Sequence, residues 1–304
     1  MRIKRRSFVK FTALMGGTAL LNSSLMSRVL GSIPNIHNPD IITTSADDPL
    51  PAVEKLVNAL GGIEKFIVPG QSVGFLLNSP WKTAGNYTHP DVALAAVKLF
   101  KNAGAGKIVV YKPVPANYWE RSRYYETNKK LVEAITYGDE RVEVAIPEGK
   151  KLKKAEVFQE FINTDVFVNI PVAKHHNGTI FSGMLKGLMG VSSSETNRQM
   201  HSPDGKYTYS KPVYLAACIA DLALLRKPDL CIFDAIECSL DNGPRGPSST
   251  VKPNKLLAGT DPLLLDVYAA DLIGFYPDDI LTFRKALENN IGKTDIKNAK
   301  ILNV

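Results

Sequence analysis

The chain has 304 residues, with 37 lysines and arginines against 30 aspartates and glutamates, and its formal net charge is +7. Six of the basic residues and none of the acids lie in 1–31, so removing that segment from +7 leaves about +1. This balance gives no indication of a nucleic-acid or membrane surface, and three cysteines are too few and too widely spaced for a disulfide framework or an iron–sulfur cluster.

The first residues are basic and are followed by a mildly apolar run. The motif Arg5-Arg6-Ser7-Phe8-Val9-Lys10 precedes an apolar stretch from Phe11 to Leu21, and this pattern predicts a twin-arginine signal peptide over 1–31. The alternative is a membrane anchor, but 11 residues fall short of the about 20 that span a bilayer. We expect export by the twin-arginine machinery to the periplasm or beyond, and no stable membrane span unless the signal stays uncleaved.

The segment 32–47 is rich in proline, asparagine and threonine, which predicts a linker. Structure is then expected to begin near Asp48, and 48–304 to form one α/β domain. Helical and apolar patterns alternate through this region, which predicts a mostly parallel sheet with helices on both faces. The expected helices are 51–60, 90–102, 118–137, 155–162, 212–225, 262–275 and 279–289, and the expected strands are 73–77, 108–111, 142–145, 165–172 and 230–234.

Ligands of open parallel sheets bind beyond the carboxyl ends of the strands. The richest of these strand ends carries Lys174, His175 and His176. A glycine-punctuated turn at 178–187 follows and predicts a short helix, whose first amides are candidates to receive an anion. The polar loop after it ends at His201.

Neutral imidazoles serve both as metal ligands and as general bases near neutral pH. We therefore take His176 and His201 as candidate metal ligands, although their spacing matches no standard zinc motif. The alternative for each histidine is a surface or capping role. Lys174 and His175 are candidate cofactor-binding residues at the same strand end.

Two further strand ends add candidates for cofactor binding. Asn78 follows the strand 73–77, and Asp234 ends the strand 230–234, ahead of the acids Glu237 and Asp241. Acids beside a Gly-Pro turn are suited to position a substrate or a cation. A solvated turn built by Asn242-Gly243 explains the same residues equally well.

Several stretches along the predicted domain form a shared pattern: Thr88-His89-Pro90-Asp91, Asn102-Ala103-Gly104-Ala105, Asn169 to His176, Met184 to Gly190, Ile219-Ala220-Asp221, Asp234, Gly243-Pro244 and Leu257 to Pro262. In these stretches the chain resembles the bacterial and archaeal domain-of-unknown-function family 362, which has no general assigned activity. Many relatives carry a cysteine-rich ferredoxin-like insertion that this chain lacks. Where many relatives have Lys-Pro-Asn, it has Leu76-Leu77-Asn78. Both departures weaken an inference of iron–sulfur redox chemistry.

The order of His176, Lys186 and His201 is similar, more distantly, to that in the nickel-pincer lactate racemases. The resemblance implies that Lys186 tethers a cofactor, that His201 ligates its metal, and that His176 moves protons or supports hydride transfer. His176 and Lys186 are therefore the candidate catalytic residues.

Two functional hypotheses follow, ahead of a third, redox chemistry without an iron–sulfur cluster. The first is an exported enzyme that holds a metal or metallo-cofactor near His175, His176, Lys186 and His201 and acts on a small anion such as a hydroxy acid. The second is a non-catalytic periplasmic protein in which Lys174, Lys186, Arg198 and the glycine turn hold a small anionic ligand.

Overall fold

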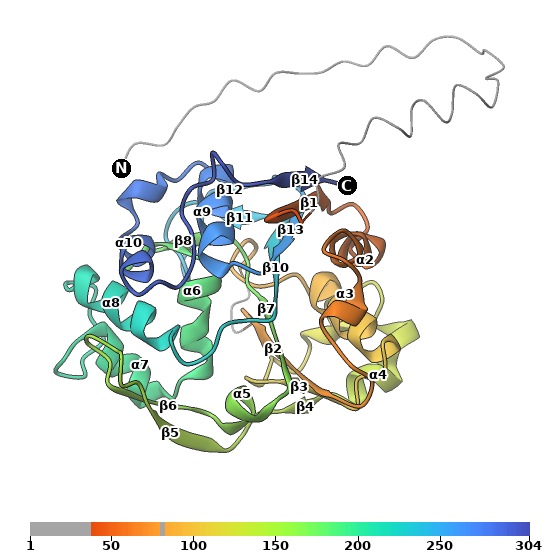
Figure 1. Ribbon diagram of the computed structural model, residues 1–304, viewed down its shortest axis with the longest axis horizontal. Helices are drawn as coiled ribbons and strands as arrows, with labels where there is room; N and C mark the ends of the chain where they lie inside the picture. The colour runs from red at the N-terminus through yellow and green to blue at the C-terminus, as the bar shows by residue number, and fades with distance from the viewer. Residues whose placement is uncertain (1–37, 80–82) are drawn as a thin grey trace, which may run out of the picture.

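The computed structural model describes residues 38–79 and 83–304; the predicted signal peptide at 1–31 lies outside them. A sheet of eight strands runs through the middle of the protein (Figure 1). Its strands, in spatial order, are β14 (Ile301–Asn303), β1 (Ile41–Ser45), β13 (Lys255–Gly259), β10 (Leu230–Ala235), β7 (Val166–Ile170), β2 (Ser72–Leu77), β3 (Lys107–Val110) and β4 (Thr136–Tyr137).

Most neighbours in this sheet are parallel. β7 pairs in parallel with β10 and β2, β2 with β3, β3 with β4, and β1 with β14. Only β13 runs against its neighbours β10 and β1. The predicted α/β fold with a mostly parallel sheet is confirmed, and the parallel strands bring the carboxyl ends of β2, β3 and β7 to one edge.

Helices cover both faces of the sheet (Figure 1). Successive residues of a strand face opposite sides: Phe75 packs into one buried cluster and Leu76 into the other. The cluster of Phe75 is covered by α2 (Pro49–Ala59), α3 (Pro90–Asn102) and α4 (Lys129–Glu133). The cluster of Leu76 is covered by α6 (Met184–Gly187), α7 (Ser194–His201), α8 (Pro212–Leu222), α9 (Pro262–Leu272) and α10 (Leu281–Glu288).

Three two-stranded sheets and several short elements complete the fold. The small sheets are β5 (Arg141–Ala145) with β6 (Lys154–Phe158), β8 (Lys174–His176) with β9 (Ile180–Ser182), and β11 (Cys238–Ser239) with β12 (Thr250–Val251). The remaining elements are α5 (Gln159–Asn163) and the 3₁₀ turns Ile63–Lys65, Trp119–Arg121, Glu126–Asn128, Leu188–Val191 and Pro277–Asp279. Within the described ranges, no helix is long and apolar enough to cross a membrane.

The predicted linker at 32–47 is corrected by β1, which lies inside the main sheet. Ile41 and Ile42 are fully buried. The threonines that made this segment look polar bond to the last strand: the Thr43 hydroxyl donates to Asn303 Oδ1 at 2.8 Å, and the Thr44 hydroxyl to the Val304 carbonyl at 2.7 Å. Ordered structure therefore begins before Asp48.

Two predicted helices are also wrong. In 155–162, Ala155 and Val157 are buried while Glu156 is exposed, and this period of two belongs to β6, which pairs antiparallel with β5. The helix begins only at Gln159. The segment 118–137 contains two 3₁₀ turns, the five-residue α4 and β4 in place of one helix.

Candidate functional site

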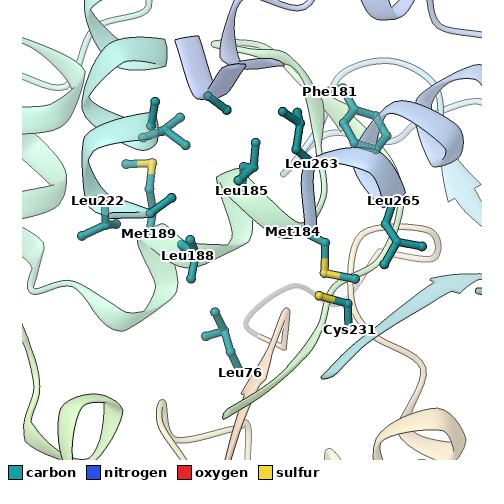
Figure 2. Packing of buried hydrophobic residues seen from close by; sticks show 14 of the residues in the cluster. Leu76, Phe181, Met184, Leu185, Leu188, Met189, Leu222, Cys231, Leu263 and Leu265 are labelled. Carbon is teal, nitrogen blue, oxygen red and sulfur yellow. The ribbon is translucent and has the colours of Figure 1, made fainter. Parts of the chain in front are cut away.

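The short helix α6 carries Lys186 and is anchored firmly in the interior. Met184 and Leu185 are fully buried and pack with Leu263 and Leu265 of α9 and Cys231 of β10 (Figure 2). The position of α6 is thus set by packing rather than by helix propensity, which is small for four residues.

A buried carboxylate occupies the amino terminus of α6. Asp266 of α9 accepts hydrogen bonds from the backbone amides of Met184 at 2.6 Å and Leu185 at 3.0 Å. Burial raises the pKa of Asp266 to about 7 although these two amides favour the charged form. The expectation that these amides receive an external anion is therefore wrong, because the protein's own side chain already binds them.

The hairpin β8–β9 directs the three residues of the Lys-His-His motif to different sides. Successive strand residues face opposite sides; Lys174 and His176 line a cavity, whereas His175 does not. His175 instead stacks on Phe275 with ring centroids 6.1 Å apart, and its Nδ1 accepts from the Gly243 amide at 3.2 Å. His175 therefore fixes the 243–247 loop instead of facing a ligand in the cavity.

The central cavity has a volume of about 280 Å³ and lies at the carboxyl ends of β2, β3 and β7. Five of the seven predicted site residues line it: Asn78, Lys174, His176, Lys186 and His201. Lys112, which follows β3, and Arg245 add further positive groups. Among the described residues of its wall there is no carboxylate, so the ionisable groups that face a ligand are predominantly basic.

Burial and repulsion from neighbouring cations lower the pKa values of the three cavity lysines. Lys174 is fully buried and donates to the Asn86 carbonyl at 3.0 Å, and burial, then the neighbouring Lys186, lowers its pKa well below the usual value. Burial and then Lys112 lower the pKa of Lys186 to about 8. The pKa of Lys112 is lowered by burial and then by Arg141. An anion among these lysines would favour their charged forms.

The two cavity histidines carry their protons on different nitrogens. Nδ1 of His176 accepts from the Gly178 amide at 3.0 Å, so the neutral ring bears its proton on Nε2. Nδ1 of His201 lies 2.7 Å from the Asn197 carbonyl oxygen, which can only accept, so this ring bears its proton on Nδ1 and leaves the Nε2 lone pair free. Burial lowers the pKa of both rings, which keeps them neutral near pH 7.

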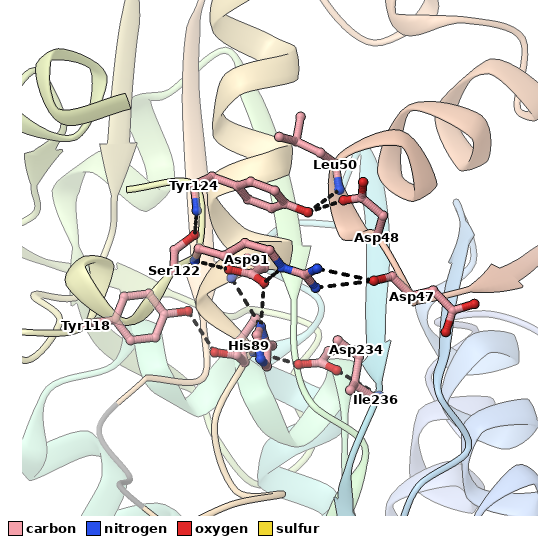
Figure 3. Close-up of polar contacts among 12 residues, drawn as sticks. Asp47, Asp48, Leu50, His89, Asp91, Tyr118, Ser122, Tyr124, Asp234 and Ile236 are labelled. Atoms are coloured by element: carbon pink, nitrogen blue, oxygen red, sulfur yellow. Dashed lines mark hydrogen bonds and ion pairs between the residues drawn. The ribbon is translucent and has the colours of Figure 1, made fainter. Parts of the chain in front are cut away.

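Asp234 lies outside the cavity. Its carboxylate accepts from the His89 amide at 2.6 Å and the Ile236 amide at 3.0 Å (Figure 3). It lies two residues after Ile232 in β10, so it faces the α2–α3 side of the sheet, away from α6. Burial raises the pKa of Asp234. We assign it to joining β10 with the start of α3 rather than to ligand binding.

The other acidic and basic candidates are also structural in this fold. Asp241 accepts from the Ser249 amide at 3.0 Å, and Glu237 accepts from the Thr250 hydroxyl at 2.9 Å, so both support the β11–β12 hairpin. Arg198 is exposed on α7 and pairs with the exposed Glu195. None of the three lines the central cavity.

Sequence reasoning missed several residues of the cavity wall. Asn169 is buried in β7; its Nδ2 donates to the Met184 carbonyl at 3.2 Å, and its Oδ1 has no hydrogen-bond partner within the described part of the chain. An amide inside the apolar run Val166–Ile170 was a signal that could have revealed it. Tyr207 and Tyr209 also line the cavity from a polar loop, which has no periodicity that could have indicated them.

The protein side chains alone do not form a standard metal centre. Across residues 38–79 and 83–304, no group of three or more histidines, cysteines, aspartates or glutamates is placed to hold a metal ion. The three cysteines are free and buried, and burial raises the pKa of each thiol. A metal at His176 and His201 would therefore need further ligands from a cofactor or from solvent.

A family model described as a domain of unknown function, DUF362, matches residues 75–271. No curated protein matches the chain. Among solved structures, similarity is found to the lactate racemase apoprotein from Thermoanaerobacterium thermosaccharolyticum, at 14% identity and a TM-score of 0.49 over 76% of this chain and 57% of that one. A protein from Thermotoga maritima is similar at 13% identity and a TM-score of 0.40, over 80% of this chain and 59% of that one.

This chain thus spans less than two thirds of the length of either structure. The family match, in contrast, extends from β2 into α9 and includes every strand whose carboxyl end borders the central cavity. It covers well over half of the 304 residues. The chain therefore belongs to the DUF362 family of proteins.

Proposed function

We propose that the protein binds a small organic anion in the central cavity and acts on it by proton transfer. The observation that carries this proposal is the wall of the cavity, where Lys112, Lys174, Lys186 and Arg245 meet two histidines without a carboxylate among the described residues. Partly desolvated cations attract an anion more strongly than the same cations in water would.

The histidines supply a complementary pair for acid–base chemistry. The Nε2 lone pair of His201 can accept a proton from a bound ligand, and the Nε2–H of His176 can donate one. Lys186, with a pKa of about 8, is roughly nine-tenths protonated at pH 7 and can hold the anion by charge. This division of roles suits removal of a proton from carbon beside a carboxylate, as in a 2-hydroxy acid.

The same residues fit a metal-containing cofactor that brings most of its own ligands. His201 would ligate through Nε2, because a metal-bound histidine usually donates its other ring N–H to a carbonyl or carboxylate, as Nδ1 does here to Asn197. The amine of Lys186, with its lowered pKa, is suited to covalent attachment. When bound, such a group would supply Lewis acidity or accept a hydride.

Export by the twin-arginine route belongs to the proposal and rests on residues 1–31. It suits a protein that folds, or receives a cofactor, before it leaves the cytoplasm. Fractionation of cells that carry the chain with Arg5 and Arg6 intact, or with both replaced by lysine, tests this part. Loss of the exported form in the double lysine variant is the expected result.

The reaction is tested by hydrogen exchange. Protein purified from its native source is incubated with small 2-hydroxy acids in deuterated water, and loss of the proton on carbon 2 is followed by NMR. The expected result is exchange that His201→Ala and Lys186→Gln each slow by about 100-fold or more. Binding without exchange would instead support the non-catalytic ligand-binding protein.

Intact mass and elemental analysis of the same preparation test the cofactor. A stoichiometric metal with an added mass that Lys186→Ala removes would support attachment at this lysine. If the Lys186→Ala protein kept its metal and activity, attachment at Lys186 would be disproved. Protein at the mass of the polypeptide alone would favour acid–base chemistry without a cofactor.

A further inference from the structure

A second, larger space, which we call the vestibule, adjoins the central cavity. It has a volume of about 780 Å³ and is lined by Asn177, Tyr207, Tyr209, Asn242, Pro244, Arg245, Gly246 and Pro247. Tyr207, Tyr209, Pro244 and Arg245 line both spaces, so the vestibule lies next to the site of the lysines. A ligand that filled only the cavity would leave the vestibule empty.

One wall of the vestibule consists of two tyrosine rings held in place by the site itself. The ring centroids of Tyr207 and His201 lie 4.6 Å apart. The ring of Tyr209 packs edge-on against His176, with the ring centroids 5.8 Å apart. A Cβ added at Gly178 would lie only 2.7 Å from the Tyr209 ring, so this ring rests directly on the backbone there.

These two rings nevertheless keep much of their surface open. Tyr207 is 61% exposed and Tyr209 is 48% exposed. A tyrosine ring that packs on one face and is exposed to solvent on the other presents an apolar surface whose hydration is unfavourable. They are therefore suited to contact a flat apolar group.

The loop 242–247, which is tied to β8, supplies most of the remaining lining. The Gly243 amide donates to His175 Nδ1 at 3.2 Å, and the Asn177 amide donates to the Gly243 carbonyl at 3.1 Å. A Cβ at Gly243 would lie 2.2 Å from the His175 carbonyl oxygen, so only glycine permits this approach. This loop contributes Pro244 and Pro247, whose rings are rigid, to the lining.

Resting on the proposed function, we infer that the ligand is an anion joined to an aromatic ring, with the anionic end among the cavity lysines and the ring in the vestibule. The lining supports this division: the cavity is rich in cations, whereas the described residues that line the vestibule include one cation, Arg245, and are otherwise tyrosine, proline, glycine and asparagine. Both walls are held by the fold, so little order has to be gained when the ring binds.

Matched pairs of anions test this inference by titration calorimetry on the full-length mature protein. The probes are lactate and 3-phenyllactate, with 3-cyclohexyllactate as an apolar ring that lacks aromatic character; methyl phosphate and phenyl phosphate repeat the comparison with another anionic head. We expect the phenyl compound of at least one pair to bind about 5- to 10-fold more tightly than its small partner.

The tyrosine variants locate the ring. Replacing Tyr207 and Tyr209 together by alanine is expected to bring the affinity ratio within a pair close to one, whereas the double phenylalanine variant keeps the ratio of the wild type. Because both tyrosines are about half exposed or more, urea unfolding is expected to show similar midpoints for the wild type and the two double variants.

The outcomes separate this inference from the proposal on which it rests. Equal affinity within both pairs would overturn the aromatic ligand and leave the small-anion site standing. Equal affinity for phenyllactate and cyclohexyllactate would also overturn it, because the vestibule would then select apolar bulk. If no probe bound at all, the anion site itself would be contradicted, and the inference with it.

Discussion

The Asp266 carboxylate lies 2.6 Å from the backbone nitrogen of Met184, although 82 residues separate the two along the chain. The same carboxylate binds the next amide, that of Leu185. These are the two residues that precede Lys186, so a side chain on α9 fixes the turn from which the lysine enters the cavity. Asp266 is not among the residues that line the cavity, which makes it a positioning residue.

Removing this carboxylate should destabilise the protein. Asp266→Ala leaves two buried amides without acceptors, and we expect the free energy of unfolding to fall by about 2 to 4 kcal/mol. Urea denaturation measures the change. Asp279→Ala, which removes an exposed acid in the turn after α9, is the control and should cost less than about 0.5 kcal/mol. Equal costs for the two variants would contradict the anchoring role of Asp266.

The titration of Asp266 predicts the sign of a pH effect. Its pKa is about 7 in the folded protein against 3.8 for the free side chain, so between these values the folded state holds a proton that the unfolded state has released. The contribution of Asp266 to stability is therefore fully present below about pH 4 and is lost as the pH rises through 7. The unfolding free energy of Asp266→Asn should decline less steeply over this range than that of the wild type. Parallel curves would show that Asp266 does not titrate there.

A pair of glycine variants tests the packing around α6. A Cβ at Gly183 would lie 2.1 Å from Asp266 Oδ1 and 2.5 Å from the Phe233 ring, whereas a Cβ at Gly187 would meet only Pro171 at 3.8 Å. We expect Gly183→Ala to lower the unfolding free energy by about 2 kcal/mol or more and Gly187→Ala to change it by less than about 1 kcal/mol. The two sites lie four residues apart, so circular dichroism melts of the pair provide a matched comparison. Equal melting temperatures would mean that α6 can shift to accommodate a Cβ at Gly183, which would contradict its tight packing.

Anion affinity should depend on pH through Lys186. Because its pKa is about 8 and an anion favours the protonated amine, the affinity for a probe anion should fall as the pH rises from 7 to 9. Lys186→Gln should weaken binding by about 10-fold or more and flatten this dependence. Lys186→Arg should keep a charge at every pH tested. Lys112 and Lys174 also face the cavity with lowered pKa values, so they set the slope that remains in the glutamine variant. A slope unchanged by Lys186→Gln would assign the titration to those two lysines.

The sequence was sufficient for the parts of the fold that follow local periodicity. The predicted helix 90–102 matches α3, and the predicted strand 73–77 lies within β2. Strands that depend on distant partners were missed or misassigned. β1 is short and contains two threonines whose hydroxyls bond to Asn303 and Val304, and β6 is defined by its pairing with β5. Nothing local to either segment reveals those partners.

The same difference between local patterns and distant contacts explains which residues of the candidate site could be predicted from the sequence. Asn78 and Lys174 could be placed together because parallel strands bring their carboxyl ends to one edge, whereas Lys186 was a candidate through a resemblance in sequence order. The alternation that turns His175 away from the cavity became visible only once β8 was known to be a strand. Asp266 and Tyr209 were not identified because each acts across a distance in sequence that no local pattern encodes: one holds α6 from α9, and the other rests on Gly178.

The parallel pair of β1 and β14 has a consequence for how the chain matures. Residues 301–303 form the strand that closes the outer edge of β1 (Figure 1). Until these residues have been synthesised, β1 presents an open edge to which another chain can add. Seven of the eight strands can therefore pair while translation continues, but the sheet is completed only after residue 303 has left the ribosome.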